Sequence, residues 1–263
     1  MPEGHTLHRI ARDHNKWFAN QELIVTSPQG RFGGEAKKLS GKRLLNAEAF
    51  GKHLFYVFGS ARKPIYMHVH LGLYGKFRVH RNAPPEPRGA VRVRMIGQER
   101  SFDLNGPNTC ELLDSCGFEK VTNRLGPDPL RSDADPEQAW TKIARSRSAI
   151  GALLLNQSVI AGLGNIYRAE ILHMLEIHPD RTGKDVTREE FDQIWELSCK
   201  LLQIGVRYNR IITVLENDKA SSRLKSAERL YVYKKPTCPR CQADIYCWEL
   251  ANRTIYACDN CQI

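Results

Sequence analysis

The chain has 263 residues, of which 41% are hydrophobic and 26% charged, and this is typical of a globular protein long enough for two domains. No apolar run approaches the length of a membrane span and no charged-then-apolar leader precedes the first predicted helix, so we expect a cytoplasmic protein. The formal net charge of +10 favours nucleic acid as the partner, although a generic basic protein would carry the same charge.

The first residues, Met1-Pro2-Glu3-Gly4-His5, offer a candidate catalytic group. The side chain after Met1 is small, so Met1 is normally removed and Pro2 becomes an N-terminal secondary amine. An α-amino group titrates at about 7.7–8, so part of it is neutral and nucleophilic near pH 7, and its attack on a carbonyl-level carbon gives an iminium. Glu3 is a candidate for proton transfer at the same centre. From these residues alone, a removable start followed by a helix cap is the favoured interpretation.

Residues 5–18 predict an amphipathic helix, because their apolar side chains recur with helical spacing. This helix would fix the position of the N-terminal amine. From about residue 21 to residue 118 the hydrophobic pattern has mostly period two, with polar turns between the runs. Many short strands of this kind predict an antiparallel sandwich or flattened barrel. The predicted strands are 23–27, 43–48, 53–58, 65–70, 76–80, 90–96 and 101–104.

Three turns of this region carry candidate functional side chains. Residues 30–34 (Gly-Arg-Phe-Gly-Gly) predict a mobile glycine-rich loop whose one cation, Arg31, is a candidate DNA contact. Lys52 lies where two predicted strands meet. Leu73 and Tyr74 lie between glycines at the tip of two strands, where exposed apolar side chains need a functional reason, and both are candidate DNA contacts. A partly buried hairpin explains Leu73 and Tyr74 equally well.

The segment 126–130 (Gly-Pro-Asp-Pro-Leu) predicts an interdomain linker, followed by helices at 136–145, 149–156, 165–176 and 187–207. Residues 160–165 (Ile-Ala-Gly-Leu-Gly-Asn) form a glycine-rich loop that opens the third of these helices. Backbone N–H groups at a helix N-terminus bind anions, and Asn165 adds a side-chain donor, so Gly164 and Asn165 are candidates to hold a phosphate. Plain glycine turn chemistry is an equally good interpretation of this loop alone.

The C-terminal residues carry a metal-binding motif. Cys238, Cys241, Cys258 and Cys261 form two CxxC pairs separated by sixteen residues, which predicts one structural, tetrahedral zinc ion with no open position for catalysis. The residues between the pairs have the pattern of a β-hairpin, with Arg253 near its tip. Cys247 lies within the hairpin and off the CxxC spacing, so a packing role is favoured over a ligand role. For Arg253 alone, solvation is the simpler interpretation.

A basic stretch over residues 200–230 precedes this module and holds seven Lys or Arg against three acidic residues. Such a stretch is usually a solvated face. The four cysteines outside the motif have no obvious pairing, which fits a reducing cytoplasm with one metal site better than a disulfide framework.

Four separated signals occur together in this chain. They are the Met-Pro-Glu-Gly start, Gly51-Lys52 at a strand junction, the loop at 162–165 and the four-cysteine finger. In this order they resemble the formamidopyrimidine-DNA glycosylase/endonuclease VIII family of base-excision repair enzymes. The resemblance extends over essentially the whole chain, and residues 70–75 (His-Leu-Gly-Leu-Tyr-Gly) and 252–254 (Asn-Arg-Thr) look like further family motifs.

The resemblance implies an α+β multidomain fold. Residues 1–125 would form an N-terminal catalytic antiparallel β-sandwich with a leading α-helix. Residues 126–230 would form a helical, helix–two-turn–helix DNA-binding domain, and residues 231–263 a four-cysteine zinc-finger β-hairpin. Damaged DNA is the implied partner, and we expect a monomer with no membrane association and no small-molecule cofactor.

The resemblance also implies a mechanism. Pro2 would attack the anomeric sugar carbon of a damaged nucleotide, a Schiff base would form, and the strand would be cut by β,δ-elimination. Glu3 would serve as proton donor and relay. Lys52 would contact the phosphate beside the lesion and assist proton transfer, and Asn165 and Arg253 would hold phosphates.

One departure from the family lies in the first turn, where many members carry a second glutamate and this chain has His5 or Thr6. The Pro-Glu-Gly start and the Leu-Tyr-Gly turn resemble the endonuclease VIII branch. The 8-oxoguanine branch typically has a Pro-Glu-Leu start and supplies Arg and Phe from a second loop, a pair that is absent from residues 105–110. We therefore expect a preference for oxidised pyrimidines.

Two other interpretations stay open. One is a non-catalytic zinc-ribbon protein that binds nucleic acid and has an ordinary N-terminus, which retention of Met1 would favour. The other is a lyase with Lys52 as the nucleophile. This second alternative requires a lysine pKa depressed by several units, whereas the Pro2 amine requires no such shift.

Overall fold

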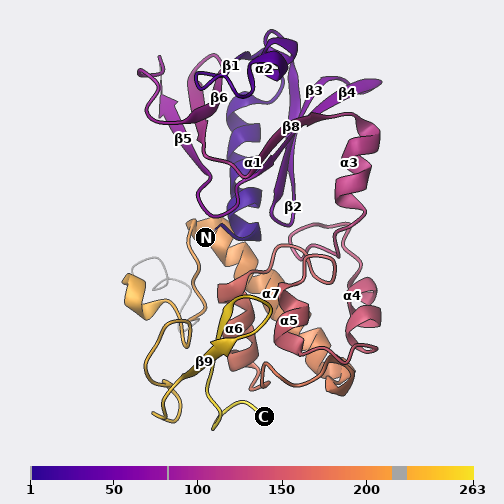
Figure 1. Cartoon of the computed structure of the whole chain (residues 1–263), viewed down its shortest axis with the longest axis vertical. Helices are drawn as coiled ribbons and strands as arrows, with labels where there is room; N and C mark the ends of the chain where they lie inside the picture. Colours follow the sequence, from indigo (N-terminus) through magenta and orange to yellow (C-terminus); the bar gives the residue numbers. More distant parts are fainter. Residues whose placement is uncertain (1, 82, 215–223) are drawn as a thin grey trace. The chain divides into compact units, whose positions relative to one another are not determined.

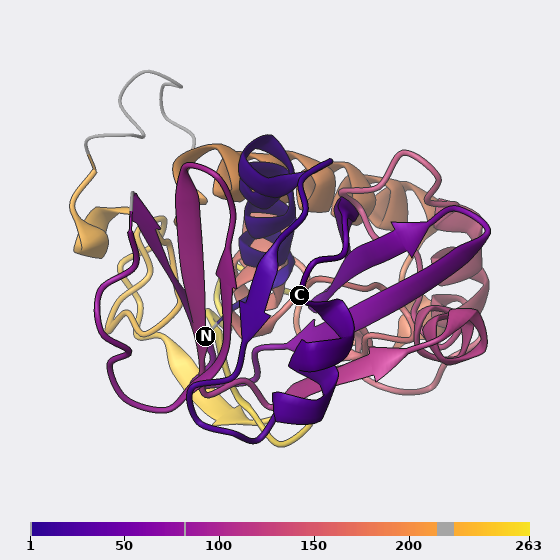
Figure 2. The ribbon, with the colours of Figure 1, turned by 90° about the horizontal axis from the view of Figure 1, so that it is seen from above.

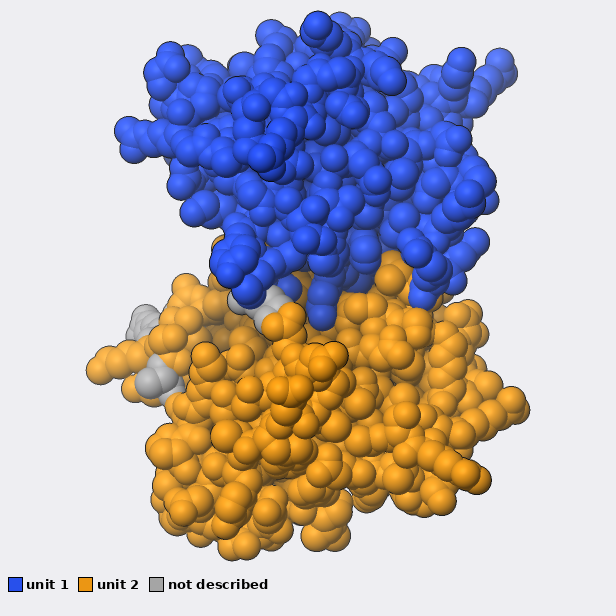
Figure 3. Space-filling model, viewed as in Figure 1, with its two compact units in different colours: residues 1–2, 7–124 blue, residues 3–6, 125–263 orange. Residues whose placement is uncertain are grey.

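Residues 2–81, 83–214 and 224–263 are described by the computed structural model. They fall into two units, which Figure 3 colours separately: unit 1 comprises residues 1–2 and 7–124, and unit 2 comprises residues 3–6 and 125–263. The three-domain division expected from the sequence stays a prediction. Of the helices in these residues, none combines the length and apolarity needed to cross a membrane.

Unit 1 is built on two antiparallel sheets of four strands each (Figures 1 and 2). One sheet has the order β1-β6-β7-β5 and contains β1 (Ile24–Thr26), β6 (Val91–Ile96), β7 (Arg100–Asn105) and β5 (Lys76–Arg81). The other has the order β2-β3-β4-β8 and contains β2 (Leu44–Phe50), β3 (His53–Ser60), β4 (Lys63–His70) and β8 (Thr109–Leu113). The predicted sandwich and the seven predicted strands are confirmed, and β8 was not predicted.

Helix α1 (Gly4–Phe18) contributes to the core of unit 1, as its apolar spacing predicts. Its residues Leu7, Ala11 and Phe18 are buried in one cluster with side chains from both sheets, such as Tyr56 of β3 and Phe102 of β7. One continuous core therefore joins α1 to the two sheets.

The predicted mobile loop at 30–34 is partly wrong. Helix α2 (Gly33–Leu39) begins inside it, and Phe32 at its N-cap is buried. Ala36 and Leu39 are buried on the same helix, so apolar burial outweighs the low helix propensity of two glycines. Helix α3 (Ser115–Thr122), capped by the side chain of Asp114, was also not predicted.

Unit 2 contains the four predicted helices: α4 (Pro136–Ile143), α5 (Ile150–Leu155), α6 (Asn165–Met174) and α7 (Arg188–Tyr208). The predicted N-caps are present, because Asp135 accepts a hydrogen bond from the N–H of Glu137, and Thr187 forms a complete capping box with Glu190. Short 3-10 turns lie at Gly183–Asp185 and Ser226–Glu228. The hairpin expected between the cysteine pairs is formed by β9 (Tyr246–Glu249) and β10 (Thr254–Ala257).

The segment predicted as an interdomain linker follows the boundary but is part of unit 2. The N–H of Gly126 donates to the carbonyl of Gln157, and the carbonyl of Pro127 accepts from Ala161. A side chain at Gly126 would collide with the backbone of Val159, only 2.2 Å from its carbonyl oxygen. Gly126 is therefore required because two backbone segments approach closely here, and not because the segment is flexible.

Candidate functional site

The carboxyl group of Glu3 lies at the N-terminus of α6. Glu3 is only 1% exposed, and its Oε1 accepts a hydrogen bond of 3.0 Å from the backbone N–H of Ile166, the second residue of the helix. The N–H of Gly4 donates to the carbonyl of Gly162 at 2.8 Å. The first residues of the chain are thus bound to the glycine-rich loop that precedes α6.

Two glycines make this binding sterically feasible. A Cβ atom at Gly164 would lie 2.3 Å from Cδ of Glu3, and one at Gly4 would lie 2.8 Å from Cα of Gly162. The positive end of α6 attracts an anion, as the sequence predicts, but the carboxyl group it receives is the protein's own. The DNA contact expected for Gly164 stays a prediction.

Asn165 and Arg168 connect α6 to the hairpin. Asn165 donates from Nδ2 to the carbonyl of Thr254 at 2.8 Å, and its Oδ1 accepts from Nε of Arg168 at 3.0 Å. Arg168 is fully buried and donates further to three backbone carbonyls, those of Gly151 at 2.9 Å, Leu250 at 3.1 Å and Arg253 at 3.2 Å. Burial lowers the pKa of Arg168 to about 10, so the guanidinium stays charged at neutral pH.

Arg253 lies in the turn between β9 and β10, as the sequence predicts, and its side chain is exposed. Its backbone is fixed through the carbonyl that Arg168 holds, and the N–H of Leu250 donates to the same carbonyl at 3.0 Å. The turn that presents Arg253 is therefore tied to α6, while the phosphate contact expected for Arg253 stays a prediction.

Glu170 and His173 extend this set of buried polar groups along α6. The carboxyl group of Glu170 accepts hydrogen bonds from the hydroxyl of Thr213 and from three successive backbone N–H groups, those of Tyr231, Val232 and Tyr233 at 2.7, 2.9 and 2.8 Å. His173 Nε2 lies 3.5 Å from Sγ of Cys238, and burial lowers the pKa of His173 to about 4. Sequence reasoning missed these roles, although charged residues inside an otherwise apolar helix were a visible signal.

The four cysteines of the two CxxC pairs converge, with their sulfur atoms all within 4.8 Å of one another. Four thiols at this separation match the donor set of a structural metal site, so Cys238, Cys241, Cys258 and Cys261 fit a tetrahedral ion. Cys247 lies outside this cluster, as its spacing predicts, but it is exposed on β9, so the expected packing role is wrong. Three of the four residues of β9 are exposed, and Cys247 is one of them.

Unit 1 carries the other predicted residues. Lys52 follows Gly51 in the two-residue turn that joins β2 to β3, where Gly51 has a positive φ of 58° and Phe50 pairs with His53. Pro2 directly precedes Glu3, and Met1 lies outside the described residues. Arg31 is exposed just before α2.

Leu73 and Tyr74 are 53% and 82% exposed, in the turn between β4 and β5. These strands belong to different sheets, so the turn is not the partly buried hairpin that the sequence also allowed. Gly75 permits the tight return, because a Cβ there would lie 2.3 Å from the carbonyl of Leu71. Two large apolar side chains are thus presented to solvent.

The basic stretch at 200–230 is only partly described. Lys200 and Arg207 lie on α7, whereas Lys219 and Arg223, and the acids Glu216 and Asp218, are outside the described residues. Its role as a basic face stays a prediction.

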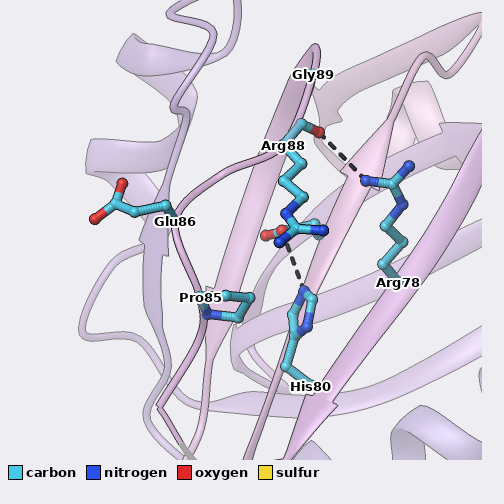
Figure 4. A pocket seen from close by; sticks show the side chains of 7 residues that line it. Arg78, His80, Pro85, Glu86, Arg88 and Gly89 are labelled. Atoms are coloured by element: carbon cyan, nitrogen blue, oxygen red, sulfur yellow. Dashed lines mark hydrogen bonds and ion pairs between the residues drawn. The ribbon is translucent and has the colours of Figure 1, made fainter.

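A pocket with a cavity volume of about 520 Å³ opens in unit 1 beside Asp103. Figure 4 shows Arg78, His80 and Arg88 around it, with Glu86 pointing away. Arg94 donates to both carboxylate oxygens of Asp103, at 2.6 and 2.8 Å. Burial raises the pKa of Asp103, but the hydrogen bonds from Arg94 and His80 outweigh burial and lower it overall. None of the site residues predicted from the sequence lines this pocket.

Comparison with known proteins places these features in a family context. The family model for the formamidopyrimidine-DNA glycosylase N-terminal domain matches residues 1–108, and the model for the H2TH domain of the same glycosylase matches residues 125–216. The chain is 46% identical to Endonuclease 8 1 of Mycobacterium tuberculosis, with full coverage of both chains. It is 30% identical to a formamidopyrimidine-DNA glycosylase of Thermomicrobium roseum, covering 86% of this chain and 84% of that protein.

A solved structure of Lactococcus lactis Fpg in complex with DNA that contains N7-benzyl-Fapy-dG is similar over 99% of each chain. It superposes with a TM-score of 0.81 at 25% identity.

The contact between Glu3 and Gly164 predicts the effect of one added methyl group. Gly164→Ala should destabilise unit 2 by about 1–3 kcal/mol in urea unfolding, because the new Cβ displaces the Glu3 carboxyl group. The matched control is Gly33→Ala, whose Cβ meets nothing within 4 Å and which should be close to neutral. Equal stability of the two variants would contradict the placement of Glu3.

Proposed function

This chain belongs to the formamidopyrimidine-DNA glycosylase/endonuclease VIII family, and from that premise we propose that it is a bifunctional DNA glycosylase and lyase that removes oxidised bases from DNA. The observation that carries the proposal is the burial of the Glu3 carboxyl group at the N-terminus of α6, directly after Pro2. We further propose that it acts as a monomer in the cytoplasm, without a small-molecule cofactor.

In the proposed reaction, the Pro2 amine attacks the anomeric carbon of the damaged nucleotide after Met1 has been removed. The glycosidic bond breaks and the base leaves with a proton; the C1′–O4′ bond then opens, O4′ takes up a proton, and the sugar remains bound to Pro2 as an iminium. Loss of the C2′ proton then expels the 3′ phosphate, and loss of the C4′ proton in a second elimination expels the 5′ phosphate. Because Glu3 is fixed, the amine and the proton donor beside it are anchored rather than carried on a free terminus.

Glu3 acts as proton donor and relay in this scheme. Its Oε1 is held by the N–H of Ile166, so the carboxyl group has a defined orientation before substrate binds. Such preorganisation lowers the cost of placing a proton donor during the reaction. Lys52, in the turn between β2 and β3, contacts the phosphate beside the lesion.

Damaged DNA is the proposed partner. The net charge of +10 favours a polyanion, and the similar Lactococcus lactis protein was solved in complex with lesion-containing DNA. Asn165 and Arg253 hold backbone phosphates; Arg168 of α6 donates to the side chain of Asn165 and to the backbone carbonyl of Arg253, and so orients both residues. Arg31 is a further candidate contact.

Zinc is the proposed metal of the four-cysteine site. When bound, it supplies a tetrahedral crosslink between the two ends of the hairpin and takes no part in the reaction. The ion would hold Cys238 beside His173 of α6. Glu170 and Arg168 of the same helix bind the adjoining backbone at residues 231–233 and in the hairpin turn.

Covalent trapping tests the role of Pro2. Borohydride should reduce the iminium to a stable protein–DNA adduct when the wild-type chain is mixed with a duplex that contains a thymine glycol or an abasic site. One additional residue at the N-terminus should abolish the adduct, because it converts the amine into an amide. Undiminished trapping by the extended chain, with loss of trapping on Lys52→Ala, would assign the nucleophile to Lys52. Retention of Met1 in the isolated protein would favour the non-catalytic alternative.

Removal of one thiol tests the metal site. Cys258→Ser should release zinc and weaken DNA binding while unit 1 stays folded, because metal binding and folding of such modules are linked. Cys247→Ser is the matched control, since this exposed thiol lies outside the cluster and should retain both zinc and affinity. Full affinity in a metal-free sample would contradict the proposal.

The turn at Leu73 and Tyr74 yields a prediction about the lesion. We propose a preference for oxidised pyrimidines over 8-oxoguanine, with these two side chains filling the gap left by the flipped nucleotide. Leu73→Ala combined with Tyr74→Ala should slow cutting of duplex DNA much more than cutting of a single strand, in which no stack must be repaired. Efficient excision of 8-oxoguanine opposite cytosine, with pyrimidine lesions ignored, would contradict the preference.

A further inference from the structure

Three histidines and a glutamate form a cluster in unit 1 next to Lys52. His53 begins β3, His68 and His70 lie on β4, and Glu111 lies on β8. The strand register brings them together, because His53 pairs with His70 and His68 pairs with Glu111. Pattern reading along the chain did not connect these residues, since their proximity depends on the pairing of three strands.

Two hydrogen bonds connect three members of this histidine cluster, Glu111, His68 and His53, in that order. His68 Nδ1 lies 2.9 Å from Oε1 of Glu111, and His68 Nε2 lies 2.9 Å from Nδ1 of His53. The ring of His68 stacks on Phe55, with a centroid separation of 4.8 Å, and its centroid lies 5.1 Å from that of the hydrogen-bonded His53. The rings of His53 and His70 are 4.9 Å apart.

The hydrogen bonds fix the tautomers of both rings. A carboxylate only accepts, so His68 Nδ1 carries the hydrogen that Glu111 receives, and Nε2 of a neutral His68 is then an acceptor. His53 must therefore donate from Nδ1, which leaves the lone pair on its Nε2. Nε2 of His53 can therefore take up a proton, and its protonation would break neither hydrogen bond.

Burial and, to a smaller extent, the neighbouring basic groups keep His53 neutral in the free protein. Burial lowers its pKa to about 3, and His68, His70, Arg124 and Lys52 lower it as well. Glu111 is the acidic member of the cluster, and it is separated from His53 by His68 in the hydrogen-bonded series. A bound phosphate would offset the positive charges of Lys52 and Arg124, and a phosphate oxygen within hydrogen-bond distance would raise the pKa of His53.

We propose that His53 is a further DNA-binding residue, which takes up a proton from solvent when a backbone phosphate binds beside Lys52 and then contacts that phosphate as an imidazolium. His68 and Glu111 are its positioning residues: they hold the ring, and the carboxylate balances the new charge through His68. This inference rests on the proposed function, because it takes the phosphate from DNA bound at the Lys52 turn.

Calorimetry of DNA binding tests the proton uptake directly. The full chain is titrated with a duplex that contains an uncleavable tetrahydrofuran residue, in pairs of buffers with different ionisation enthalpies. We expect fractional proton uptake that increases as the pH falls from 8 to 5, with affinity rising by at most roughly tenfold per pH unit, the limit for one proton. Wild-type protein that binds this duplex without proton uptake, and that cuts a second duplex with an oxidised pyrimidine, overturns this inference alone. Protein that neither binds the first duplex nor cuts the second contradicts the proposed function too.

Variants locate the proton. His53→Gln should abolish the uptake, and Glu111→Gln, which keeps an acceptor for His68 but removes its charge, should reduce it. His80→Gln is the matched control, because His80 pairs with Asp103 on the other sheet and should leave the uptake unchanged. Uptake that persists in His53→Gln, or that is lost only in His70→Gln, overturns the assignment.

Imidazole nitrogen NMR provides a measurement that needs no variant. The unbound wild-type chain should show His53 as the neutral Nδ1–H tautomer, with Nε2 gaining a proton on DNA binding at pH 6. An Nε2–H tautomer for His53 in the unbound chain would contradict the hydrogen-bonded relay.

Discussion

The hydrogen bond between the Ile166 N–H and the Glu3 carboxyl group is the contact on which the site of unit 2 depends. It satisfies one of the N–H groups that every helix leaves without a partner at its start, and it places an acidic group where the helix dipole favours negative charge. Asn165, Arg168 and Glu170 of the same helix form hydrogen bonds with the backbone of the C-terminal region, at residues 254, 250 and 232. One helix thereby positions both the N-terminal segment and the hairpin.

Burying a guanidinium and a carboxyl group on one helix is costly unless hydrogen bonds compensate the lost hydration. Arg168 meets this condition with four acceptors, three of which are backbone carbonyls, and Glu170 receives three backbone N–H groups. Irregular segments rarely fold against a helix through apolar contacts alone, because their own polar groups need partners. The charged residues of α6 supply these partners for residues 231–233 and for the turn before β10.

Much of this arrangement could be predicted from local patterns. Hydrophobic residues at every second position predict the strands of the sandwich, and the capping box at Thr187 predicts the start of α7. The spacing of the two CxxC pairs predicts that the four cysteines converge. Local sequence patterns do not predict interactions between segments that are distant in the sequence. The loop before α6 has the pattern of a phosphate site, yet the group it binds arrives from residue 3, and no local signal encodes that pairing.

The remaining differences have specific physical causes. Glycines at 33 and 34 suggest a loop, but burial of Phe32, Ala36 and Leu39 favours a helix. The histidine cluster depends on the register of three strands, which sequence spacing alone does not fix. Arg168 is a basic residue that composition would place at the surface, and its burial follows only from the carbonyls around it.

Amide hydrogen exchange at Ile166 tests the central contact most directly. In the wild-type chain this N–H donates to a carboxyl group that is almost wholly buried, so it should exchange slowly. In Glu3→Ala the acceptor is gone, and exchange at Ile166 should accelerate while amides in the middle of α7 keep their wild-type rates. Equal exchange of the Ile166 amide in the two proteins would show that Glu3 does not bind the start of α6, and the account of the site would be contradicted.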